Sequence, residues 1–89
     1  MDKPRKHIRF EPDENTFVLA KGDSGITHSG ICVDESQSGC AGVFKKHNDL
    51  IPKKMIMVKV GQLDVISAEI RWAKILDEGI VKVGFQYLE

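Results

Sequence analysis

The chain has 89 residues, of which 42% are hydrophobic and 29% are charged, a composition typical of globular domains and not of disordered or fibrous proteins. Lys plus Arg and Asp plus Glu number 13 each, so the basic excess that general nucleic-acid binders show is missing. No apolar stretch approaches the length of a membrane-spanning helix, and the charged N-terminus lacks the apolar segment of a secretory signal. Two cysteines, Cys32 and Cys40, do not make a disulfide framework. We therefore expect one cytoplasmic domain with no membrane insertion and no DNA or RNA partner.

The first 15 residues differ in character from the rest of the chain. They are polar and contain Pro4 and Pro12, which predicts a flexible, extended arm without a stable helix. Residues 16–89 are predicted to form the folded domain. Their apolar runs are short and are separated by turn residues, which is the pattern of strands. The predicted strands are residues 16–21, 26–33, 40–44, 55–60, 65–74 and 80–88.

Period-two alternation predicts which strand faces are buried. Ile56, Val58 and Val60 share one face, and so do Val81, Val83, Phe85 and Tyr87. In residues 65–74 the alternation of Ala68, Ile70 and Trp72 with polar neighbours favours a half-buried strand, with a short helix as the alternative. Residues 45–54 read as a charged loop, and Gly79 suits the left-handed position of a hairpin. Six short strands joined by turns predict an all-β fold, a small six-stranded antiparallel barrel.

Two motifs stand 25 residues apart, counted from position 9 to position 34. The first is Arg-x-x-x-Arg at Arg5 and Arg9, and the second is Asp-x-Ser-x-x-Gly at Asp34, Ser36 and Gly39. A guanidinium fork matches the O6 and N7 acceptors of guanine and also the oxygens of a phosphate. A carboxylate accepts from the N1 and N2 hydrogens of guanine, and glycine permits a close approach or a positive φ. The pair of motifs predicts a nucleotide-binding module.

On these residues the chain resembles the PilZ domain, a bacterial receptor module for cyclic di-GMP. The resemblance also includes residues 68–72 (AEIRW) and 84–88 (GFQYL) and covers nearly the whole chain. It implies a six-stranded barrel whose arm folds across the barrel mouth when ligand is present. By the same resemblance, Arg5 and Arg9 grip phosphates and guanine edges, while Asp34, Ser36 and the backbone around Gly39 complete the guanine site.

Three further residues are candidates for ligand contacts: Lys6, Ser38 and Trp72. The alternation places Trp72 on the face of Ala68 and Ile70, which favours core packing, whereas the resemblance places a Trp or apolar residue at this position. Many PilZ domains carry an additional Arg where this chain has Pro4, and many continue into a C-terminal helix, which we do not expect here. Without that helix, a barrel face is open to self-association or to a partner.

The sequence supports several other functions less well. No pattern of nucleophile and base or of paired carboxylates indicates an enzyme, so no catalytic residue and no cofactor is expected. His28, Cys32, Cys40 and His47 match structural zinc spacings poorly, so no metal site is expected. The predicted function is a cyclic di-GMP receptor, a monomer or weak dimer, that relays binding to a protein partner. The alternatives are a PilZ-like interaction module that does not bind nucleotide and an oligonucleotide-binding barrel, which needs more aromatic side chains.

Overall fold

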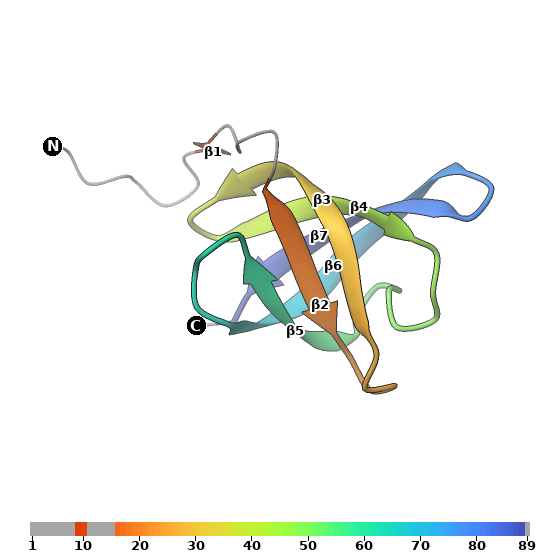
Figure 1. The fold of residues 1–89 in the computed structure, drawn as a ribbon, viewed down its shortest axis with the longest axis horizontal. Coiled ribbons are helices and arrows are strands. Elements are labelled where there is room, and N and C mark those ends of the chain that lie inside the picture. The colour runs from red at the N-terminus through yellow and green to blue at the C-terminus, as the bar shows by residue number, and fades with distance from the viewer. Residues whose placement is uncertain (1–8, 11–15, 89) are drawn as a thin grey trace, which may run out of the picture.

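A computed structural model describes residues 9–10 and 16–88, which form one antiparallel sheet closed on itself (Figure 1). The strands are β1 (Arg9–Phe10), β2 (Phe17–Lys21), β3 (Thr27–Ser36), β4 (Gly39–Lys45), β5 (Met55–Val60), β6 (Ile66–Asp77) and β7 (Ile80–Tyr87). Their order is β1-β3-β2-β5-β6-β7-β4, and an additional pairing of β3 with β4 closes the ring. The six strands β2 to β7 therefore make the predicted barrel, and the two-residue β1 is attached to β3. In the described parts of the chain no helix is present that could cross a membrane.

The predicted strands are confirmed, with different ends. Strand β3 runs to Ser36, three residues beyond the expected end, so the connection to β4 shortens to Gln37 and Ser38. Strand β6 continues to Asp77, which rules out the alternative of a helix there. In Figure 1 the β6–β7 hairpin extends beyond the body of the barrel. Its tip contains Gly79 with φ of 78°, the left-handed conformation that was predicted.

Apolar side chains fill the barrel and stabilise it. Their burial follows the predicted faces of β5 and β7 and removes large apolar areas from water. The core consists of Val18, Ala20, Cys32, Cys40, Phe44, Leu50, Ile56, Val58, Val60, Ala68, Ile70, Val81, Val83 and Phe85. Leu50 was expected in a charged loop, but only 2% of it is exposed. The loop of residues 46–54 thus contributes one apolar side chain to the core.

Trp72 is the clearest departure from the predicted pattern. The pairing of β6 with β7 matches Ile70 to Phe85 and then Trp72 to Gly84, so Arg71 is an extra residue, a β-bulge. Because side chains alternate along a strand, one extra residue moves the next side chain to the opposite face. Ile70 is fully buried, whereas Trp72 is 43% exposed on the outer face, so its expected core packing was wrong.

Candidate functional site

A cleft of about 350 Å³ lies on the outer face of the barrel where β3, β4, β7 and β6 run side by side. It is lined by Asp34, Glu35, Ser36, Ser38, Gly39, Cys40, Ala41, Arg71, Trp72, Gly84, Phe85 and Gln86. The strand register explains its shape. Asp34 pairs with Ala41, Ala41 with Gly84, and Gly84 with Trp72, which makes one row across four strands. The two small residues form the floor of the cleft, and Asp34 and Trp72 form its two walls.

Two bulges bring these walls to the same face. In β3 the register shifts between Cys32 and Asp34, so Val33 is the extra residue. Cys32 is buried in the core, and unbroken alternation would turn Asp34 inward as well. The bulge turns Asp34 toward the outside, as the bulge at Arg71 does for Trp72. A carboxylate and an indole, on opposite sides of a small-residue floor, can bind the edge and the face of a planar heterocycle.

The connection between β3 and β4 is held by the hydroxyl of Ser36. Its Oγ accepts a hydrogen bond from the backbone N–H of Ser38 at 3.3 Å and donates to the carbonyl of Gly39 at 3.4 Å. The Ser38 hydroxyl lies 3.3 Å from the same oxygen. The Ser38 carbonyl accepts from the backbone N–H of Tyr87 at 2.9 Å, which ties the connection to β7. Ser36 therefore orders this side of the cleft.

Two glycines permit close approaches that any larger residue would prevent. A Cβ on Gly39 would lie 2.0 Å from the carbonyl oxygen of Phe85, so the predicted need for glycine arises from strand packing. Gly39 does not have a positive φ. A Cβ on Gly84 would lie 2.2 Å from Cε2 of Trp72, so the indole rests directly on the backbone of β7. The glycine at position 84 thus allows the indole to lie directly on the strand.

The two predicted motifs meet in the backbone pairing of β1 with β3. Arg9 pairs with Ser36, and Phe10 pairs with Glu35. This pairing brings the backbone of the first motif to the edge of the second. The cleft itself brings together five of the predicted site residues: Asp34, Ser36, Ser38, Gly39 and Trp72. Arg5 and Lys6 lie outside the described residues.

Seven lining residues were not predicted as site residues, and three of them have charged or amide side chains: Glu35, Arg71 and Gln86. Arg71 is the bulge residue of β6, and its Nη1 donates to Oε1 of Glu69 at 3.3 Å. Burial raises the pKa of the Glu35 carboxyl above its ordinary range. These residues come from separate strands, and although Gly79 predicts the β6–β7 hairpin, no local pattern indicates that β3 contributes to the same cleft. Only the register of the closed sheet assembles them.

Comparison with solved structures identifies the fold, whereas comparison of sequences finds no match. No protein-family model and no curated protein sequence matches the chain. Among solved structures, the chain is similar to the "PilZ domain with c-di-GMP of YcgR from Escherichia coli", with a TM-score of 0.66 and 18% sequence identity. The match covers 98% of this chain and 79% of that one. The chain has the fold of a PilZ domain, as its resemblance to that family implied.

Proposed function

We propose that this PilZ-fold barrel is a receptor for cyclic di-GMP and not an enzyme. In this proposal the N-terminal arm, residues 1–15, closes over the cleft and holds the ligand against the Asp34–Gly39 turn. The observation that supports it most is the pairing of Arg9 with Ser36, which joins the two motifs at one edge of the cleft. The similar domain of YcgR is described with c-di-GMP, which agrees with this ligand class.

The ligand chemistry matches the side chains that line the cleft. Cyclic di-GMP offers two guanines and two phosphates. Asp34 can accept from the N1 and N2 hydrogens of one guanine, which adenine does not offer, and Trp72 can stack on a base. Arg5 and Arg9 are the proposed clamp for phosphates and for the O6 and N7 edge. Lys6 and Ser38 are proposed as additional contacts.

Ordering of the arm is the proposed signal to a protein partner in the cytoplasm. Fixing the arm costs conformational entropy, so the charge-assisted bonds of the ligand must exceed that cost. The barrel also has an apolar outer surface, distinct from the cleft, that a partner can cover. It includes the exposed Phe17 and Leu19 of β2 and, opposite Phe17 in β3, Ile31. Contiguous apolar patches of this kind typically mark interaction surfaces.

Calorimetric titration with cyclic di-GMP tests the proposal, with GTP, cyclic GMP and cyclic di-AMP as controls. We expect saturable binding of cyclic di-GMP alone, with a Kd in the micromolar range, or about −8 kcal/mol. The variants Arg5→Ala and Arg9→Ala should each weaken binding about ten- to a hundredfold, because each removes charged hydrogen bonds of about 1.5–3 kcal/mol. Circular dichroism should show an intact barrel in both.

The matched control is Lys3→Ala, a cation of the same arm outside the motif. It should bind within about twofold of the parent protein, since a solvated charge contributes little. Equal affinity in the parent, Arg5→Ala and Arg9→Ala would show that the arm is not the clamp. Absence of any binding would favour the alternative, an interaction module that uses the apolar surface of β2 and β3 and does not bind nucleotide.

A further inference from the structure

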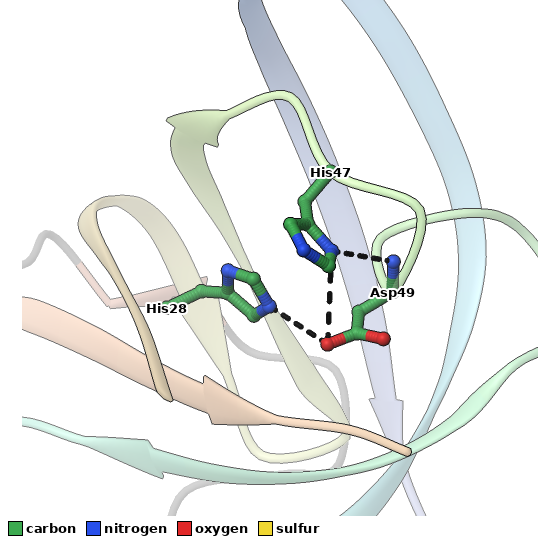
Figure 2. Close-up of side chains that lie close together, drawn as sticks. All are labelled: His28, His47 and Asp49. Carbon is green, nitrogen blue, oxygen red and sulfur yellow. Dashed lines mark hydrogen bonds and ion pairs between the residues drawn. The ribbon is translucent and has the colours of Figure 1, made fainter. Parts of the chain in front are cut away.

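Three side chains with metal-ligating atoms gather at the end of β3 that lies away from the cleft. His28 stands near the start of β3, while His47 and Asp49 belong to the loop of residues 46–54 (Figure 2). One ligating atom from each lies within 4.8 Å of the other two. His28 Nε2 is 2.9 Å from Asp49 Oδ2, and His47 Nδ1 is 3.7 Å from the same oxygen. The two imidazole rings lie side by side with centroids 4.4 Å apart and planes tilted by 52°.

We propose that His28, His47 and Asp49 bind a divalent first-row transition metal ion, with zinc as the best fit. Zinc bonds of about 2.0–2.2 Å to nitrogen and oxygen place neighbouring tetrahedral ligands roughly 3.3 Å apart, and the separations of 2.9 and 3.7 Å lie on either side of that value. Two imidazoles and one carboxylate favour zinc and its neighbours over magnesium and calcium, which prefer oxygen ligands. Three protein ligands leave one position for water.

Burial of the carboxylate supports a built site. Among residues 16–88, Asp49 is the charged residue that is buried, and its side chain is only 7% exposed. A buried carboxylate needs partners, and Ser24 Oγ donates to Asp49 Oδ2 at 2.5 Å. His28 Nε2 contacts the same oxygen at 2.9 Å, so two partners hold the carboxylate in place. Ser24 orients the carboxylate through Oδ2, the oxygen that also contacts His28.

The protons of the cluster are compatible with metal binding. The backbone N–H of Asp49 donates to His47 Nδ1 at 3.0 Å, so this nitrogen is unprotonated, and a metal bound through it replaces this hydrogen bond. When neutral, His28 donates its Nε2 proton to Asp49 Oδ2. A metal ion takes the place of this shared proton when His28 adopts the other neutral tautomer, protonated on Nδ1. His47 is 34% exposed on its loop, which leaves its ring room to adjust.

The cysteines do not take part. Burial, with a smaller effect of Glu35, raises the pKa of Cys32 to about 11. Burial raises the pKa of Cys40 to about 12, so both thiols stay protonated at neutral pH. Neither thiol belongs to the group of ligating atoms that lie within 4.8 Å of one another in the described part of the chain, which consists of His28, His47 and Asp49. The proposed site differs from the set of His28, Cys32, Cys40 and His47, which matched zinc spacings poorly, because Asp49 stands in place of both thiols.

The experiment is a zinc titration of the untagged, chelator-treated protein, followed by calorimetry and by thermal unfolding. We expect one Zn²⁺ per chain with a Kd in the micromolar range or tighter, a higher Tm with zinc, and no effect of Mg²⁺. His28→Gln and His47→Gln should each weaken binding by more than about tenfold. The matched control is His7→Gln, which changes the third histidine of the chain and should bind zinc like the parent.

Cobalt provides a second readout, because its visible absorption reports a low-coordinate site with nitrogen ligands. That absorption should appear in the parent and in His7→Gln and should be lost in His47→Gln, whose exposed side chain makes it the variant safest for folding. Zinc binding that survives both His28→Gln and His47→Gln would overturn the proposal. So would a parent that binds no zinc below about 1 mM while Asp49→Asn lowers the Tm, which would make the cluster a hydrogen-bonded tie only. Neither result depends on whether cyclic di-GMP binds.

Discussion

At the scale of single residues, the second motif serves folding as well as the proposed ligand. The Ser36 hydroxyl already bonds within its own turn, and Gly39 is required because β4 approaches the Phe85 carbonyl closely. The residue types were predicted from the sequence, but these structural duties were not. They depend on a strand that is distant in sequence, β7, whose position beside β4 no local pattern indicates.

Burial disfavours the charged form of Glu35 in the cleft. Its raised pKa means that the native state holds a proton at pH values where the unfolded chain has already lost it. The contribution of protonated Glu35 to stability is therefore fully present below the ordinary carboxyl pKa of 4.5. It declines as the pH rises through the higher native pKa. We expect Glu35→Gln to raise the Tm at pH 7 relative to the parent.

The same variant should bind cyclic di-GMP more tightly, since it removes an anion from a site proposed to hold phosphates. Thermal unfolding between pH 3 and pH 8 checks the first expectation, and the gain in Tm should vanish below about pH 4.5. The matched control is Glu78→Gln in the exposed β6–β7 turn, which should change the Tm little at any pH. A loss of Tm in Glu35→Gln at pH 7 would contradict this account.

At the scale of secondary-structure elements, the strands were predictable and the bulges were not. Alternation of apolar residues located β5 and β7 and their buried faces, because each strand keeps one side against the core. The same rule failed at Arg71, where an inserted residue reverses the alternation. A bulge has no reliable signature in one sequence, so the outward positions of Asp34 and Trp72, and with them the cleft, could be known only from the sheet register.

Strict alternation places Ile70 and Trp72 on the same buried face, so it predicts similar losses of stability when either is replaced by Ala. The bulge in β6 predicts unequal losses. Ile70→Ala should lower the free energy of unfolding by about 2–5 kcal/mol, because it leaves a cavity in the core. Trp72→Ala should cost less than half as much, since 43% of this side chain is exposed, and it should weaken cyclic di-GMP binding. Urea denaturation of both variants measures the difference. Equal losses would mean that Trp72 packs in the core.

At the scale of the whole molecule, closure of the sheet joins distant segments into one unit. Strand β3 pairs with β2 at its start, with β4 toward its end and with β1 at its last residues, so it links the histidine cluster to the cleft. The core passes without interruption between these ends. We therefore expect one cooperative unfolding transition for the barrel, as in other small domains.

Cooperative unfolding makes ligand binding visible in the Tm. Cyclic di-GMP at about 100 times its Kd should stabilise the native barrel by about 2.7 kcal/mol. For a domain of this size that corresponds to a rise in Tm of roughly 10–20 °C. Differential scanning calorimetry checks the rise, and Arg9→Ala at the same ligand concentration should show a much smaller one. Binding seen by calorimetric titration without any rise in Tm would mean that the ligand contacts the arm and not the folded barrel.

The alternation of inward and outward side chains also bears on how such domains diverge. Only the inward positions must be apolar, and aliphatic residues of similar volume replace one another there at modest cost. The outward positions are free to change wherever no ligand or partner depends on them. Two barrels can therefore share only 18% of their residues while their backbones still superpose with a TM-score of 0.66. Similarity of the backbone can therefore persist where similarity of sequence is low.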